Sequence, residues 1–206
     1  AQSQITSKRP VIAILDTGVD TTHPDLVDNL WVNTAEAEGE DYVDDDGNGY
    51  VDDVHGWDII SGRGATDDPY GHGTHCAGIA AAVGDNKIGI TGANPDALIM
   101  PITVMQSDGT GDVATIIKGI DYAAANGADV ISMSIGGYGY SMAEEQALAK
   151  AYNKAVLVAA AGNDCRPINP TTRCPACVSP GAPTFPAAFT FVLGVEASAK
   201  GGGRAS

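Results

Sequence analysis

The chain has 206 residues, of which 44% are hydrophobic and 26 are glycine, and its formal net charge is -15. This length suits one domain with a well-buried core, and the composition is unlike that of a coiled coil or a disordered chain. The negative charge argues against nucleic acid as a partner, because the fold as a whole would repel phosphate backbones.

Several largely apolar runs have the length of buried strands. Val11–Leu15 follows Pro10 and ends at Asp16-Thr17-Gly18, as a parallel strand ends at a turn. Further predicted strands are Ala97–Met105, Ala128–Ile135, Ala155–Ala161 and Phe189–Val195. No run approaches the length that spans a bilayer, so we expect no membrane span.

Segments with helical spacing lie between the predicted strands. Asp112–Ala125 carries apolar residues on one face and is followed by Asn126-Gly127, which predicts a helix with a glycine C-cap. Ser141–Lys154 is a second predicted helix, and Ser141 forms a capping-box pattern with Glu144. Strands that alternate with helices predict a three-layer α/β fold, with a mostly parallel sheet covered by helices on both faces.

Two segments break this alternation. Asn29–Thr66 is rich in Asp and Gly and is predicted to be an irregular insertion, whereas Asp164–Pro186 holds six prolines and is predicted to be a long surface loop. That loop contains Cys165, Cys174 and Cys177, which favours a disulfide and therefore a secreted protein or another oxidising compartment. The pairing stays open, with Cys76 as the remaining cysteine.

A zinc site is the alternative for these three cysteines, because Cys174-Pro175-Ala176-Cys177 has the two-residue spacing of a zinc knuckle. A knuckle normally has a second ligand pair at matching spacing. Only Cys165 lies near, and no histidine lies in the region, so a disulfide is the favoured interpretation.

The segment from Asp44 to Asp53 offers oxygen ligands at alternating positions, with Gly49 at the sixth, as in an EF-hand-like calcium loop. His55 stands where the loop's last glutamate would be. Carboxylates this close together repel one another unless a cation or solvent compensates them, so a solvated acidic loop is the alternative. The predicted calcium ligands are Asp44, Asp46, Asn48, the Tyr50 carbonyl, and Asp52 or Asp53.

The decisive pattern lies in Asp16-Thr17-Gly18-Val19-Asp20 and His72-Gly73-Thr74-His75. The aspartate follows a buried strand, and His72 begins a small-residue helix that continues over Gly73–Val83. Either segment alone also suits an Asx turn or a helix-start histidine. Together and in this order they resemble the subtilisin family of serine proteases, and the resemblance extends from about Val11 to Ser206.

This resemblance implies roles for individual residues. Asp16 is the orienting carboxylate and His72 the general base and acid, whereas His75 is a structural neighbour. Asn163 matches the asparagine that donates to the oxyanion of the tetrahedral intermediate. The strand Ile131–Gly137 resembles the family's substrate-binding strand. Its residues Ser134, Ile135 and Gly136 would line the non-primed side of the cleft.

The family's nucleophilic serine lies in a Gly-Thr-Ser-Met-Ala segment that is absent from this sequence. The resemblance therefore implies that residues 1–206 are the N-terminal major part of a single subtilisin-like peptidase domain, incomplete at its C-terminus and inactive alone. The expected partners are a protein or peptide substrate, the remaining C-terminal part of the domain, and a pro-region.

The resemblance also implies a second calcium site, in the loop after the histidine helix. Its ligands would be the carbonyls of Gly84, Ile88 and Ile90, the side chains of Asn86 and Asp25, and Gln2 or Gln4. Both calcium sites would hold loops in place without doing chemistry.

Cys76, directly after His75, resembles the thiol of one branch of the family and would make the intact enzyme sensitive to mercurials. A small buried hydrophobic residue is the alternative role for this cysteine.

The function that follows is a serine endopeptidase acting through an Asp-His-Ser mechanism. The alternative is a calcium-stabilised, catalytically inactive peptide-binding module with the same fold. An aspartic protease would need a second Asp-Thr-Gly or Asp-Ser-Gly, and an α/β hydrolase would need Gly-x-Ser-x-Gly. Neither pattern occurs in the chain.

Overall fold

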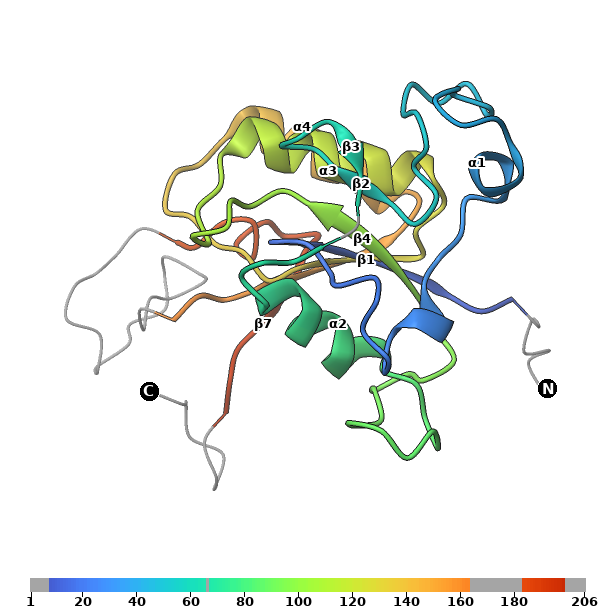
Figure 1. Cartoon of the computed structure of the whole chain (residues 1–206). Coiled ribbons are helices and arrows are strands. Elements are labelled where there is room, and N and C mark those ends of the chain that lie inside the picture. The colour runs from blue at the N-terminus through green and yellow to red at the C-terminus, as the bar shows by residue number, and fades with distance from the viewer. Residues whose placement is uncertain (1–7, 66, 164–182, 199–206) are drawn as a thin grey trace, which may run out of the picture.

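The computed structural model of the chain describes residues 8–65, 67–163 and 183–198. Within these ranges one sheet has seven strands in the order β3-β2-β4-β1-β5-β6-β7 (Figure 1). The strands are β1 (Val11–Asp16), β2 (Trp57–Asp58), β3 (Arg63–Gly64), β4 (Leu98–Thr103), β5 (Val130–Met133), β6 (Val156–Ala160) and β7 (Leu193–Val195). The helices are α1 (Thr34–Glu38), α2 (His72–Ala81), α3 (Val113–Ala125) and α4 (Met142–Tyr152), with a 3-10 helix η1 (Val27–Asn29).

Strand β1 lies near the middle of the sheet and pairs in parallel with β4 and β5. Asp16 at its end is in register with Thr103 at the end of β4. Strand β6 continues the parallel order beyond β5, and among the strands of the described residues only β2 and β3 pair antiparallel. Because parallel strands end at the same edge, the residues that follow β1, β5 and β6 are brought to one side of the sheet.

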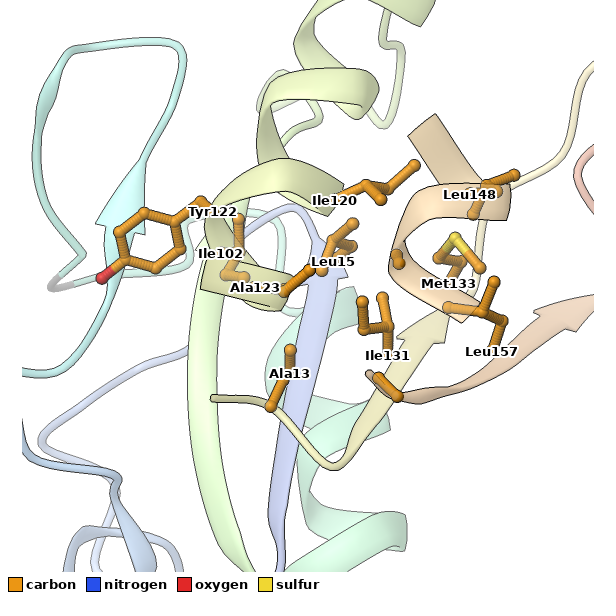
Figure 2. Packing of buried hydrophobic residues seen from close by; sticks show 14 of the residues in the cluster. Ala13, Leu15, Ile102, Ile120, Tyr122, Ala123, Ile131, Met133, Leu148 and Leu157 are labelled. Carbon is orange, nitrogen blue, oxygen red and sulfur yellow. The ribbon is translucent and has the colours of Figure 1, made fainter. Parts of the chain in front are cut away.

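Helices cover both faces of the sheet, which confirms the predicted three-layer fold. Alternate residues of β1 point to opposite faces: Leu15 belongs to the core cluster under α3 and α4, and Ile14 to the cluster that includes Ala77 of α2. Figure 2 shows the first cluster, in which Leu15 and side chains of β5 pack below Ile120 of α3 and Leu148 of α4.

Helix α3 begins and ends as the sequence predicts. The Asp112 side chain accepts the Thr115 backbone N–H, and Gly127 follows the helix with a φ of 81°. The Ala128 N–H closes the end by donating to the Ala123 carbonyl at 3.1 Å, as in a Schellman motif.

The capping box predicted for α4 forms only in half. The Ser141 hydroxyl accepts the Glu144 N–H at 3.3 Å, as expected. Among the residues that the structure describes, no bond runs back from the Glu144 side chain to the Ser141 N–H. The Glu144 carboxylate instead lines a pocket beside the helix, where only 3% of the residue is exposed.

Two predicted segments differ from the structure. Asn29–Thr66 is not wholly irregular, because it holds α1 and the short strands β2 and β3. The predicted strand Phe189–Val195 is a strand only over its last three residues, Leu193–Val195. Phe189 and Val192 are buried in a turn that precedes it.

Some predictions fall outside the described residues. They concern Cys165, Cys174 and Cys177 with most of their loop, and the candidate ligands Gln2 and Gln4. Within the described ranges, no helix is both long enough and apolar enough to span a membrane.

Candidate active site

Asp16 and His72 meet at the edge of the sheet, as the sequence predicts. Asp16 is fully buried at the end of β1, and its Oδ1 lies 2.7 Å from Nδ1 of His72. The same oxygen accepts the Thr17 backbone N–H at 2.7 Å. The second carboxylate oxygen is buried without a hydrogen bond in the described part of the chain. An ionised carboxylate in this place fixes the imidazole tautomer with the proton on Nδ1.

His72 is the first residue of α2, and its side chain is 44% exposed. Helix α2 approaches β1 very closely at Gly73, because a Cβ there would lie 2.0 Å from the Gly18 carbonyl oxygen and 2.9 Å from Cβ of Asp16. Only glycine permits this approach. The exposed part of the imidazole is thus accessible to a substrate, while Nδ1 contacts the Asp16 carboxylate.

Asp68 ties the start of α2 to the turn after β1, and the sequence analysis missed it. Its carboxylate accepts hydrogen bonds from the Thr17 hydroxyl, the Gly71 N–H, and both the N–H and the hydroxyl of Thr74, all between 2.8 and 2.9 Å. Burial by itself would raise the pKa of Asp68, but the Thr74, Gly71 and Thr17 hydrogen bonds outweigh it and lower the pKa.

Cys76 lies one helical turn after His72, and its Sγ is 3.9 Å from His72 Nδ1. Burial raises the pKa of the thiol, and a hydrogen bond with Ser134 opposes that shift. The three ligand-type atoms of Asp16, His72 and Cys76 lie within 4.8 Å of one another. His75 is exposed, and its backbone N–H donates to the Gly71 carbonyl at 3.1 Å, whereas its ring makes no hydrogen bond within the described ranges.

The predicted substrate and oxyanion residues follow neighbouring strands at the same edge. Ser134 directly follows β5 and is half-buried, and Asn163 comes three residues after β6 with an exposed side chain. Thr184 packs closely against the segments after both strands, because its Cγ2 would lie 2.9 Å from a Cβ at Gly136 and 3.3 Å from one at Gly162. Sequence reasoning missed this threonine, which lies far along the chain.

The family of the chain is shown by comparison with known proteins. The model of the subtilase family of peptidases matches residues 7–206, nearly the whole sequence. The chain belongs to the subtilase family. This membership accounts for the buried Asp16–His72 pair and confirms the resemblance on which the roles above depend.

Individual relatives support the same membership. Thermitase of Thermoactinomyces vulgaris is 41% identical over 153 residues, which cover 74% of this chain and 47% of thermitase. Subtilisin DY of Bacillus licheniformis is 38% identical over the same share of this chain and 46% of its own. Subtilisin-like protease 1 of Plasmodium berghei is 35% identical over 65% of this chain and 23% of its own. The subtilase chain thus spans about half the length of the two bacterial relatives and a smaller share of the Plasmodium relative.

The acidic loop of this subtilase contacts Glu36, a residue that was not predicted as a metal ligand. Carboxylate oxygens of Glu36, Asp46 and Asp53 lie within 4.8 Å of one another, and Glu36 and Asp53 are buried. Glu36 comes from α1, outside the predicted loop, and its Oε1 accepts the Asp45 N–H at 2.7 Å. Burial raises the pKa of Asp53, although hydrogen bonds including that from Tyr122 oppose the rise.

The other predicted ligands of this loop lie nearby but outside that trio. Asn48 donates from its side chain to both Asp46 and Asp53, and Tyr50 donates its N–H to the Asn48 side chain. Asp44 accepts the N–H groups of Asn48 and Gly49, and Asp52 accepts the N–H of Tyr42. All the donor atoms available to an ion are oxygens, the ligand type that Ca²⁺ requires.

The structure also brings together described residues of the second predicted metal site. Asp25 is 3% exposed and accepts the Asn86 amide at 2.7 Å and the Ile90 N–H at 2.9 Å. These two bonds, the Asn86 bond being the stronger influence, lower the pKa of Asp25. Ile88 donates its N–H to the Asn86 side-chain oxygen. Gly84 lies beside them in the chain, after Val83, which donates to the Asp25 carbonyl.

Proposed function

We propose that the full-length protein is a serine endopeptidase that cleaves peptide bonds through an Asp-His-Ser mechanism. The observation that carries this proposal is the 2.7 Å contact between buried Asp16 and half-exposed His72. The nucleophilic serine is supplied by residues that follow Ser206. In the alternative, the same cleft binds peptides without cleaving them.

The proposed mechanism assigns one proton path to the pair. Asp16 keeps the proton on Nδ1 of His72, so Nε2 can accept the proton of the serine hydroxyl as the serine attacks the scissile carbonyl. Asp16 then stabilises the imidazolium, which delivers the proton to the leaving amine. Asn163 donates its amide N–H to the oxyanion, a contact whose loss costs about 3–4 kcal/mol in such enzymes.

The substrate would bind as an extended strand. The backbone of Ser134, Ile135 and Gly136 continues β5 at the edge where Asp16 lies, and it can exchange hydrogen bonds with a peptide beside it. Such pairing reads the peptide backbone and leaves selection of side chains to the pockets around it. This arrangement suits cleavage within polypeptides.

We also propose calcium as a structural ion. Glu36, Asp46 and Asp53 would hold one ion, with Asn48 and the rest of the predicted loop beside it, and Asp25 and Asn86 would help hold a second. The fit rests on the donor chemistry, which is all oxygen, and on the burial of Glu36, Asp53 and Asp25. The ion would screen the clustered carboxylates. The cysteine-bearing loop supports a secreted or otherwise oxidising location for the protein.

A peptidase assay on the full-length protein tests the function. The wild type is expected to cleave a casein or peptide-library substrate and to lose this activity with a serine-directed inhibitor. His72→Ala is expected to lower kcat by about 10⁶-fold and Asp16→Asn by about 10⁴-fold. His75→Ala is the matched control and keeps activity. Peptide binding without any cleavage by the wild type would instead support the inactive peptide-binding module.

A further inference from the structure

A pocket of about 420 Å³ opens beside the proposed substrate strand. Its walls come from Ile135 and Gly136 after β5, Gly111 before α3, Ile116 of α3, and Phe185. Ligand pockets in proteins have volumes of roughly 300–1,000 Å³, so one amino-acid side chain fits here with room to spare. Because two of the wall residues also belong to the substrate strand, the pocket lies where a bound peptide would place a side chain.

Glu144 of α4 lines this pocket and is its only charged lining residue among those the structure describes. Only 3% of Glu144 is exposed, yet its carboxylate makes no hydrogen bond or ion pair within the described ranges. Burial raises the pKa of the Glu144 carboxyl.

The helix does not need this carboxylate. In a capping box the side chain at this position would bond the Ser141 N–H, but here only the Ser141 hydroxyl takes part in the cap. The neighbouring Glu145 differs, since its Oε2 accepts the Tyr140 hydroxyl at 2.6 Å. The Glu144 carboxylate therefore plays no part in the helix cap and has no hydrogen-bond donor in the described part of the chain, so a ligand in the pocket can supply one.

We infer that Glu144 is a specificity residue, which selects a substrate with a lysine or arginine side chain at one position N-terminal to the scissile bond. The aliphatic stem of that side chain would lie against Ile116, Ile135 and Phe185, and its charged end would meet the carboxylate. The net charge of -15 favours the approach of a basic peptide. This inference rests on the proposed peptidase function.

The test compares peptides that differ in one residue. The full-length enzyme cleaves matched peptides with lysine or its uncharged isostere norleucine at each position N-terminal to the scissile bond, and kcat/KM is measured. At one position the wild type is expected to favour lysine by about 10-fold or more, as loss of a buried charge pair implies. Glu144→Gln should reduce this preference to within about 2-fold, with norleucine cleavage little changed.

Two further variants separate the possible outcomes. Glu145→Gln removes the same charge one residue along α4 and keeps the lysine preference. Glu144→Lys should reverse the preference, so that a glutamate peptide is cleaved better than a lysine peptide. A wild type that cleaves norleucine and lysine peptides equally at every position contradicts this inference alone. A wild type that cleaves no peptide contradicts the proposed function, and this inference with it.

Discussion

Asp68 shows how a residue without a chemical role can set the geometry of a catalytic pair. Its carboxylate binds Thr17, next to Asp16, and Thr74, two residues after His72. The two halves of the pair are therefore joined through Asp68 as well as directly. Thr74 extends the connection, because its hydroxyl accepts the Asp20 N–H at 2.9 Å.

We predict that Asp68→Asn lowers kcat by about 10-fold or more, because a small displacement of His72 disturbs the proton path. The variant also loses about 1–3 kcal/mol of unfolding free energy, since an amide oxygen cannot accept all of the carboxylate's hydrogen bonds. Peptidase kinetics and thermal unfolding of the full-length protein check both values. Asp67→Asn is the matched control, because within the described residues the Asp67 carboxylate makes only an exposed ion pair with Arg63.

The sign of the pH dependence follows from the lowered pKa of Asp68. A carboxyl whose folded pKa lies below its ordinary value of 3.8 stabilises the fold above that pH, and the contribution is lost as pH falls through the folded pKa. The stability difference between wild type and Asp68→Asn should therefore be full at neutral pH and shrink toward pH 3. A difference that stays constant would contradict a role for the ionised carboxylate.

Glu144 gives the opposite prediction. Its folded pKa is raised above the ordinary 4.5, so the buried ionised form destabilises the free enzyme once pH exceeds that value. Glu144→Gln should unfold at a higher temperature than the parent at pH 7 and at a similar temperature near pH 4. Unfolding is best followed in a His72→Ala background, which prevents self-digestion. Equal unfolding temperatures at pH 7 would show that the carboxylate has a partner in solution.

At the scale of elements, helix α2 depends on its glycines in two different ways. Gly73 faces β1, where a side chain would collide with the Gly18 carbonyl, whereas a Cβ at Gly78 has nothing within 4 Å. Gly73→Ala is expected to cost about 1–3 kcal/mol through overpacking and to lower kcat, because α2 must move with His72. Gly78→Ala is the matched control. It should stabilise by about 0.5–1 kcal/mol, because alanine is the better helix former.

Unfolding in urea and peptidase kinetics distinguish these two alanine variants. Equal effects of the two substitutions on stability and kcat would mean that α2 does not pack closely against β1 at Gly73. A fall in kcat with unchanged stability would instead place the whole effect in the orientation of His72.

The elements with a strong periodic or apolar signal were predictable from the sequence. Strands β1 and β4 are continuous apolar runs, and α3 has both its apolar stripe and its caps in the sequence. Strands β2 and β3 have two residues each, too few for any alternation to register. They exist because Trp57 pairs with Ile102 of β4, a contact that depends on tertiary structure.

The same distinction applies to the site residues. Asp16 and His72 stand in local motifs, so their meeting could be predicted from two short segments. Glu36, Asp68 and Thr184 carry no motif, and each acts on residues from a different part of the chain. The capping box at Ser141 forms only in half, and the burial of Glu144 beside a pocket depends on tertiary structure that the local pattern does not contain.

At the scale of the whole molecule, the sheet ends on one side at strand β7. In the described part, β7 pairs only with β6, and its Leu193 and Val195 are 60% and 51% exposed. An open edge with apolar side chains is normally covered in a stable domain. Any segment that covers this edge would lie on the side of the sheet remote from β3 (Figure 1).

The proposed calcium ions act at this same scale, because they compensate part of a net charge of -15 and tie loops to the sheet. The Glu36, Asp46 and Asp53 cluster joins α1 to the acidic loop, and Tyr122 of α3 donates to Asp53. An ion that binds only the folded state stabilises it by about 3 kcal/mol at 100 times its Kd. Chelation with EGTA is therefore expected to lower the unfolding temperature of the full-length protein.

Two variants of α1 decide whether Glu36 holds such an ion. Glu36→Gln replaces a buried carboxylate with a neutral amide and should lose part of the calcium-dependent rise in unfolding temperature. The rest of the rise would come from the site at Asp25. Glu38→Gln lies two residues along the same short helix, is exposed, and should keep the whole rise. Calcium titrations monitored by thermal unfolding compare them. Identical responses in the two variants would remove Glu36 from the ligand set. A wild type indifferent to EGTA would mean that hydrogen bonds stabilise the buried carboxylates instead, those of Asn33, Asn48 and Tyr122 to Asp53 and those of the Asp45 and Asp52 N–H groups to Glu36.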